Sequence, residues 1–79
     1  MLSNLIGKAR NLHVTLWLRS GRKLAVKVLD YDDIFCEVIV KINEKTGEFA
    51  ATREEFDLED GVWIEDRILV NIDDISLIV

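Results

Sequence analysis

Apolar and polar residues alternate along most of the chain, and this period of two is typical of β-strands that bury one face. From Leu12 onward every second residue is apolar, until a turn at Gly21 that favours a hairpin. A third alternating run covers residues 35–42, after an acidic corner at Asp30–Asp33. Residues 11–42 are therefore predicted to form strands 1–3 of a bent antiparallel sheet.

The C-terminal part of the chain returns to the same alternation after a turn at Gly61. A fourth long strand is predicted up to Val70, with a bend or bulge at Asp66, because that carboxylate interrupts the apolar face. A second acidic corner, Asn71–Asp74, precedes a short and nearly continuous apolar strand. Residues 61–79 are therefore predicted to form strands 4 and 5.

Two segments do not follow the period of two. Residues 1–10 have apolar positions at helical spacing, which predicts a short N-terminal helix. Within residues 43–60, Thr52 and Glu55 have the spacing of a capping box, whereas the preceding residues 49–52 could equally extend a hairpin. We interpret residues 43–60 as a variable connection, made of a hairpin extension followed by a short helical turn.

The chain has 79 residues, so residues 1–79 are interpreted as a single domain. A domain this small commonly needs a disulfide, a metal or oligomerisation to be stable. The chain has one cysteine and one histidine, which excludes an internal disulfide and a recognisable zinc site. No cofactor is predicted, and self-association remains as the expected source of extra stability.

No stretch is apolar for long enough to span a bilayer, and residues 1–10 lack the features of a signal peptide. We therefore expect a cytoplasmic protein without a membrane partner, in which Cys36 is a free thiol.

Charge is distributed unevenly along the chain. Residues 1–29 carry six basic residues and no acidic one, whereas residues 30–79 carry four basic and fifteen acidic residues. This asymmetry is consistent with a basic face for a polyanion. It is equally consistent with complementary charge between neighbouring subunits or with an ordinary solvated surface, which the net charge of −5 favours.

The order of these elements resembles that of the Sm/Lsm (Sm-like, Hfq-related) family. The first part of the resemblance is the alternation Val14–Leu24 with its Ser-Gly-Arg turn, followed by the aromatic-Asp pair within Val28–Phe35. The second part is the spacing of apolar residues around Asn71 within Ile68–Leu77. The resemblance covers nearly the whole chain except residues 43–60.

The resemblance implies an all-β fold with a short N-terminal helix, in which a strongly bent five-stranded antiparallel sheet forms an Sm-like (SH3-like) small barrel. It also implies a homo-oligomeric ring joined through strands 4 and 5, which binds single-stranded RNA near its pore. The interface residues would then be Ile68, Val70, Ile75 and Leu77. The positions that match the family's RNA site are Asp32, Phe35 and Asn71.

The chain departs from the family pattern at that site. Cys36 stands where the family has an asparagine, and Asn71-Ile72 stands where it has Arg-Gly. With Asp73 following, the corners would form an acidic pore that disfavours phosphate. Phe35 either stacks on a base or belongs to the core, and its apolar neighbours favour the core.

The departures move the expected RNA contact toward the basic N-terminal part of the chain. Trp17 is a candidate stacking platform there, although a contact with the helix or with a subunit is the favoured interpretation of this residue. The cations of this candidate surface are Lys8, Arg10, Arg22 and Lys23.

The resulting prediction is a non-catalytic, ring-forming scaffold of RNA metabolism. The alternative is a homo-oligomeric protein-interaction scaffold without a nucleic-acid role. Binding of a hard cation by the acidic corners is a weaker hypothesis, because acidic turns are usually only solvated. An enzyme is the weakest, because His13 and Cys36 have no orienting partner at a recognisable spacing.

Overall fold

The computed structural model describes residues 8, 10–59 and 61–79. The helix predicted over residues 1–10 lies outside this range, apart from Lys8 and Arg10. In chain order the elements are β1 (His13–Leu18), β2 (Lys23–Tyr31), β3 (Phe35–Asn43), the short helix α2 (Arg53–Phe56), β4 (Trp63–Asn71), the 3-10 turn η1 (Ile72–Asp74) and β5 (Ile75–Ile78).

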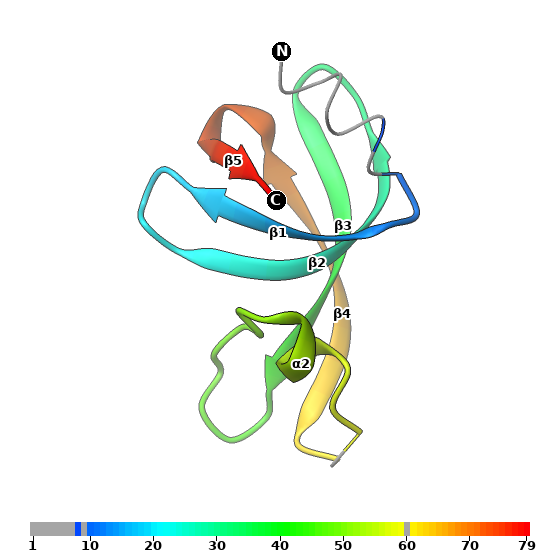
Figure 1. Ribbon diagram of the computed structural model, residues 1–79, viewed down its shortest axis with the longest axis vertical. Coiled ribbons are helices and arrows are strands. Elements are labelled where there is room, and N and C mark those ends of the chain that lie inside the picture. The colour runs from blue at the N-terminus through cyan, green and yellow to red at the C-terminus, as the bar shows by residue number, and fades with distance from the viewer. Residues whose placement is uncertain (1–7, 9, 60) are drawn as a thin grey trace.

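The strands form one antiparallel sheet in the order β4-β3-β2-β1-β5. Figure 1 shows that β1 and β2 run across the direction of β4, so the sheet is strongly bent. The register aligns the apolar positions of neighbouring strands, with Val14 opposite Val26 and Val28 opposite Val38. Because opposite residues of an antiparallel pair share a face, one side of the sheet is apolar. We call this side the core face and the other the outer face.

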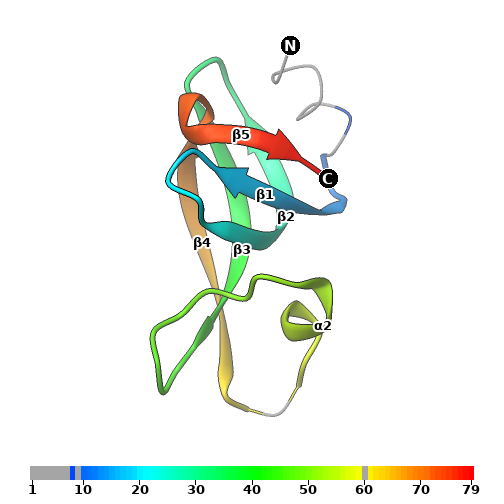
Figure 2. The ribbon, with the colours of Figure 1, turned by 60° about the vertical axis from the view of Figure 1, so that its left-hand side comes forward.

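The predicted five-stranded antiparallel sheet is confirmed, but the predicted closure into a barrel is not observed. Among the described residues, β4 pairs with β3 alone and β5 pairs with β1 alone. The turn η1 reverses the chain after β4, and β5 then lies beside β1 (Figure 2). The free edges of β4 and β5 therefore lie at the two ends of the sheet and are not paired with each other.

The irregularities of the sheet differ from those predicted. The register of β2 and β3 shifts between Val28 and Asp30, and β2 continues to Tyr31 instead of ending at the acidic corner. The bulge predicted at Asp66 is wrong, because β4 pairs with β3 without a shift along its whole length. Asp66 is exposed, so its carboxylate reaches water without disturbing the ladder.

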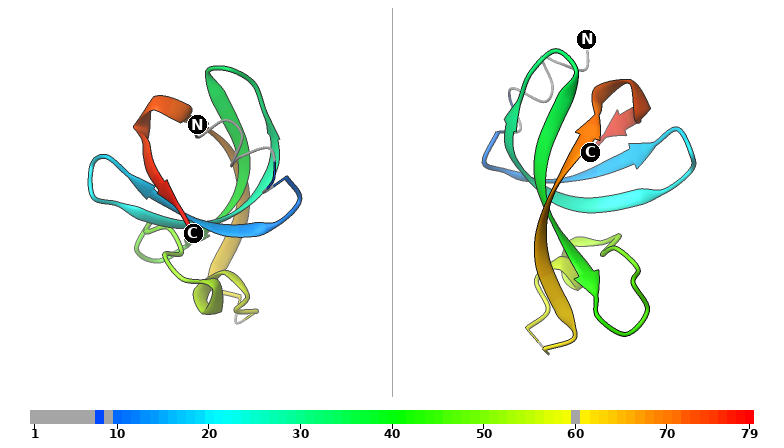
Figure 3. Two further views of the ribbon diagram at one scale, coloured as in Figure 1. Left: turned by 45° about the horizontal axis from the view of Figure 1, so that its top comes forward. Right: turned by 180° about the vertical axis from the view of Figure 1, so that it is seen from behind.

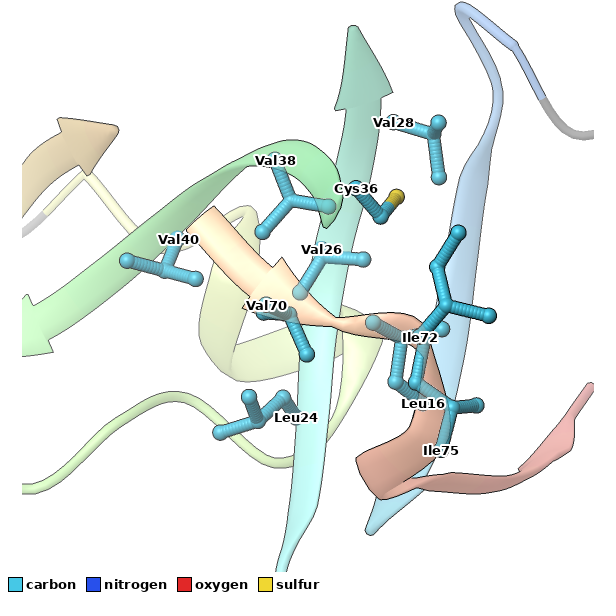
Figure 4. Close-up of a cluster of buried hydrophobic side chains, with 10 residues drawn as sticks. All are labelled: Leu16, Leu24, Val26, Val28, Cys36, Val38, Val40, Val70, Ile72 and Ile75. Carbon is cyan, nitrogen blue, oxygen red and sulfur yellow. The ribbon is translucent and has the colours of Figure 1, made fainter. Parts of the chain in front are cut away.

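The core lies on the concave side of the bent sheet and is entirely apolar (Figure 4). Full burial of one large aliphatic side chain stabilises a fold by roughly 1.5–3 kcal/mol. This cluster is therefore the main stabilising feature of the fold. Its buried members are Leu16, Leu24, Val26, Val28, Cys36, Val38, Val40, Val70, Ile72 and Ile75.

Residues 43–59 form a hairpin extension and a helical turn, as the sequence predicts for the connection 43–60. The extension is marked by the bridge between Ile42 and Phe49. Thr52 caps α2, because its side-chain oxygen accepts a hydrogen bond from the Glu55 N–H at 3.2 Å. Phe56 then packs in a second cluster with Ala25 and Ala50. Figure 3 shows that α2 lies toward the end of the molecule opposite β5.

Candidate nucleic-acid interface and sheet edges

The hairpin between β1 and β2 brings the predicted tryptophan and two of the predicted cations together. The Leu18 N–H donates to the Arg22 carbonyl at 2.8 Å, and the Gly21 N–H donates to the Leu18 carbonyl at 2.9 Å. Gly21 has a φ of 91°, a backbone conformation that side chains other than glycine rarely adopt. This tight turn sets the register in which Trp17 lies opposite Lys23.

Both cations of the hairpin lie against aromatic rings. The Lys23 Nζ is 5.3 Å from the centroid of the Trp17 ring, and the Arg22 guanidinium carbon is 6.0 Å from the centroid of the Phe49 ring. Such contacts stabilise an exposed pair by about 0.5–1 kcal/mol and hold the cations in place. Trp17 remains 39% exposed. We call Trp17, Arg19, Arg22, Lys23 and Phe49 the hairpin surface.

Two members of this surface were missed by sequence reasoning. Phe49 lies in the connection between β3 and β4, and its ring is brought to the hairpin by the bridge to Ile42 and by the hydrogen bond that the Ala25 N–H of β2 donates to the Ala50 carbonyl. Arg19 follows β1 directly, and its side-chain N–H donates to the Asp73 carbonyl. The basic run of residues 19–23 was a signal for Arg19, whereas no local signal indicates Phe49.

The other two predicted cations lie elsewhere. The Arg10 Nε donates to the Leu29 carbonyl at 3.3 Å, and its guanidinium is 3.8 Å from the Asp30 carboxylate. Arg10 is therefore at the far end of β2 from the hairpin. Lys8 is exposed and near it in sequence. The fold thus divides the basic N-terminal residues into two groups.

The three residues that match the family's RNA site meet at the corner between β2 and β3. Phe35 lies opposite Asn71 on β4, and its carbonyl accepts from the Asp32 N–H at 2.8 Å. The Asp32 carboxylate accepts from the N–H groups of Ile34 and Phe35, both at 2.7 Å. These two bonds lower the pKa of Asp32 below its ordinary value of 3.8.

The polar atoms at this corner are already used by the fold. Asp32 holds its own turn, and the Asn71 side-chain oxygen accepts from the Asp73 N–H at 2.9 Å. Phe35 is 40% exposed, so the interpretation of Phe35 as a core residue is wrong. The reason is that the strand begins at Phe35, and the burial of β3 starts only at its second residue.

The aromatic rings of the corner line a depression of about 240 Å³. Its lining combines apolar and acidic side chains, from Asp30, Tyr31, Asp32, Phe35, Glu37 and Leu69. A phosphate backbone is repelled from such a surface, because three of the six lining residues are acidic.

The two residues considered for catalysis are not brought together. Cys36 is fully buried on the core face, where burial first and the negative charge of Asp30 second raise the pKa of its thiol to about 11. His13 lies on the outer face, with its ring 5.0 Å from that of Phe56 in an edge-to-face contact. A protonated, inaccessible thiol is a poor nucleophile.

The remaining candidates lie on the two free edges of the sheet. On β4, Val70 is buried and Ile68 is half-buried against the core, whereas their neighbour Leu69 is 62% exposed. On β5, Ile75 is fully buried, whereas Leu77 is 52% exposed. Each edge therefore carries a large apolar side chain that no described residue covers.

Two further findings concern the described part of the chain. Within residues 8, 10–59 and 61–79, no group of three His, Cys, Asp or Glu side chains is placed to hold a metal ion. In the same range, no helix is long and apolar enough to cross a membrane.

Comparison with known proteins gave no match to a family model, to a curated protein or to a solved structure.

Proposed function

We propose that this chain is a subunit of an Sm-like homo-oligomeric ring, joined through the edges of β4 and β5, which binds single-stranded RNA on its hairpin surface. The observation that carries the proposal is the strand order, because it places β4 and β5 at the two free ends of one strongly bent sheet. The activity is binding, without catalysis.

The edge of β4 supports the assembly. This strand has nine residues, and exposed edges of that length are prone to pair with another chain unless they are protected. The chain has no proline to interrupt it. A contact between two different edges is head-to-tail, and head-to-tail contacts form a ring when the rotation closes.

The hairpin surface supports the RNA contact. It combines an exposed tryptophan with three cations, and the described residues between Arg10 and Leu29 include no acidic one. Aromatic rings stack on unpaired bases while cations neutralise the phosphates, which is how proteins bind single strands without reading their sequence. Repetition around a ring would align several such surfaces and increase the affinity for one strand.

The first experiment measures assembly. Light scattering and native mass spectrometry should give one discrete multiple of the 9.1 kDa subunit mass. A chain that stays monomeric at high concentration would end the proposal, because both edges would then be unpaired in solution.

The second experiment measures RNA binding by fluorescence anisotropy over a range of salt concentrations. The affinity for a labelled single strand should fall steeply with added salt, with a slope of about −0.7 for each phosphate contacted. Replacing both Arg22 and Lys23 by alanine should flatten this slope. Lys45→Ala is the matched control, because Lys45 is exposed in the turn after β3 and belongs neither to the hairpin surface nor to the edges of β4 and β5.

One observation favours a second candidate function, a protein-interaction scaffold without RNA. The acidic and aromatic depression at the corner suits a basic partner better than a nucleic acid. A discrete oligomer that binds no single-stranded RNA at low salt would favour this alternative.

A further inference from the structure

Arg19 differs from the other two cations of the hairpin surface, because backbone carbonyls hold it and not an aromatic ring. The backbone N–H of Arg19 donates to the Asp74 carbonyl at 2.8 Å, and its side-chain Nε–H donates to the Asp73 carbonyl. Both carbonyls belong to η1, the turn that leads from β4 into β5 beside the hairpin (Figure 2). Two adjacent carbonyls of one turn therefore fix the backbone and the side chain of Arg19 together.

This orientation of the Arg19 guanidinium leaves most of its donors free. An arginine side chain has five N–H donors in a planar fork. In Arg19 the Nε–H is used, and among the described residues the side chain makes no other hydrogen bond and no ion pair. The N–H groups of the two terminal nitrogens remain, and their planar arrangement matches two oxygens of one phosphate.

The turn that holds Arg19 is itself held at both ends. Asn71 is the N-cap of η1, where its side-chain oxygen accepts from the Asp73 N–H at 2.9 Å. Ile72 is buried at the start of the turn, and Ile75 is fully buried directly after it, so the core anchors the backbone on either side. The position of the Asp73 carbonyl, and with it that of the Arg19 guanidinium, therefore depends on the side chain of Asn71.

The start of β5 also holds the backbone of Trp17. The Ser76 hydroxyl donates to the Trp17 carbonyl at 3.0 Å, and the register of β1 and β5 shifts between Trp17 and Leu18. Arg19 follows this irregularity directly. The stacking ring and the guanidinium of the hairpin surface are therefore both fixed by one segment, residues 73–76.

We propose that Arg19 binds one phosphate of the RNA strand through two parallel hydrogen bonds, and that Asn71 is the positioning residue for this contact. A long arginine side chain ordinarily loses rotamer freedom when it binds a ligand. The Asp73 carbonyl already restricts the Arg19 side chain, so less entropy is lost in the complex. The inference rests on the proposed RNA binding, and it specifies which contact anchors the strand and what orients that contact.

The other cations of the hairpin surface contribute charge more than geometry. The charged groups of Arg22 and Lys23 lie over aromatic rings, and such a contact directs no individual N–H group toward a ligand. The exposed carboxylates of Asp73 and Asp74 lie on the turn beside Arg19 and repel phosphate. Charge alone is therefore a weak attraction at Arg19, whereas a directed bidentate contact acts at hydrogen-bond distance.

The first test compares Arg19→Lys with Arg22→Lys, since both variants keep the charge and remove the planar fork. Binding of a labelled single-stranded RNA is measured by fluorescence anisotropy over a range of salt concentrations. Arg19→Lys should weaken binding about 3- to 10-fold, the effect of one lost hydrogen bond, and should leave the salt dependence unchanged because the charge remains. Arg22→Lys should change the affinity by less than about twofold, because Arg22 acts through its charge.

The role of Asn71 is tested by two variants. Asn71→Ala removes the oxygen that caps η1 and should weaken RNA binding about 2- to 5-fold, whereas Asn71→Ser keeps a capping oxygen and should restore the affinity. Arg19→Lys combined with Asn71→Ala should bind no more weakly than Arg19→Lys alone, since both changes remove the same contact. A direct contact of the Asn71 amide with a base would instead give additive losses and no rescue by serine.

Nuclear magnetic resonance of the protein without RNA provides an independent measurement. The Arg19 Nε–H should exchange with water about tenfold more slowly than the Arg22 Nε–H, and Asn71→Ala should remove this protection. Equal losses of affinity for Arg19→Lys and Arg22→Lys, or an unprotected Arg19 Nε–H, overturn the proposed contact. Trp17→Ala still measures RNA binding at the hairpin surface in that case, so the proposed function is judged separately. An unmodified protein that binds no RNA overturns both proposals.

Discussion

Aromatic rings beside the two ends of β2 are exposed to a nearly equal extent, but the charges around the two rings are opposite. Trp17 at the hairpin and Phe35 at the corner are 39% and 40% exposed. The Trp17 ring has the ammonium group of Lys23 over it, whereas the depression beside Phe35 is lined by three carboxylates. An exposed ring alone is therefore a poor guide to a nucleic-acid site, and the charges around the ring distinguish the two surfaces.

The hairpin surface and the corner also differ in how their polar side-chain atoms are used. Two cations of the hairpin surface, Arg22 and Lys23, contact rings and keep their side-chain donors available to a ligand, whereas Arg19 donates its side-chain N–H to the Asp73 carbonyl. At the corner, the side-chain oxygens of Asp32 and Asn71 accept bonds from the backbone and hold the turns. The corner thus uses its polar groups for the fold, whereas the hairpin presents them outward. This difference favours RNA at the hairpin.

The largest expected effect is on RNA affinity. Trp17→Ala should weaken binding of a single strand about 5- to 150-fold, because stacking of one base on an aromatic ring contributes about 1–3 kcal/mol. Phe35→Ala should leave the RNA affinity within about twofold of the unmodified protein, since the acidic corner repels the RNA strand. Anisotropy titrations of both variants test the comparison directly. A larger loss for Phe35→Ala than for Trp17→Ala would reverse the assignment of the two surfaces.

The sequence predicted well the features that depend on near neighbours in the chain. Alternation located β1 to β3, because a half-buried strand leaves its own period in the sequence. The capping of α2 followed from Thr52 and Glu55, which are three residues apart. The hairpin contact of Lys23 with Trp17 is also local, since a tight turn joins the two strands.

Features that depend on distant partners were predicted less well. The bulge was placed at Asp66 because a carboxylate interrupts an apolar pattern, but pairing with β3 continues there and the side chain reaches water. Arg10 was grouped with Arg22 by sequence, yet β2 separates them, and Arg10 contacts Asp30 instead. Closure of the sheet is likewise a non-local property, since it depends on whether β4 and β5, the strands at its two ends, pair with each other.

The second prediction concerns the buried side of the corner. Cys36→Ser should lower the free energy of unfolding by about 1–3 kcal/mol, because a buried hydroxyl replaces an apolar thiol. Cys36→Ala, which removes the titrating thiol, is the comparison variant for the pH dependence of stability. The folded state raises the thiol pKa from 9.0 to about 11, so folding favours the protonated form. Stability from this group is full below pH 9 and is lost as the pH rises toward 11.

Denaturant titrations at several pH values measure this effect as the difference between the unmodified protein and Cys36→Ala. The difference should shrink as the pH rises from 9 to 11. A difference that stays constant over this interval would mean that the thiol is not protected by burial as the structure indicates.

A smaller effect is expected from the exposed turn of the corner. Asp32→Asn should lower the Tm by about a few degrees at neutral pH, because an amide oxygen accepts the two backbone hydrogen bonds less strongly than a carboxylate. The folded state lowers the pKa of Asp32 below 3.8, so its contribution is present above that pH and is lost as the pH falls through the lower folded pKa. The Tm values of the two proteins should therefore converge in acid. A gap that widens below pH 3.8 would contradict this role of the carboxylate.

The smallest expected effect tests whether the basic residues at the two ends of β2 are equivalent. Arg10→Ala should change the free energy of unfolding by about 0–1 kcal/mol, because its ion pair with Asp30 is 3.8 Å long and mostly exposed. The same variant should change RNA affinity by less than about twofold, since Asp30 already neutralises this guanidinium. Arg22→Ala, by contrast, should weaken binding more and reduce the salt dependence, because the guanidinium of Arg22 contacts an aromatic ring and no carboxylate among the described residues. Equal losses for the two variants would show that the bound RNA strand runs along the whole of β2. In that case the contrast between hairpin and corner would not decide where RNA binds.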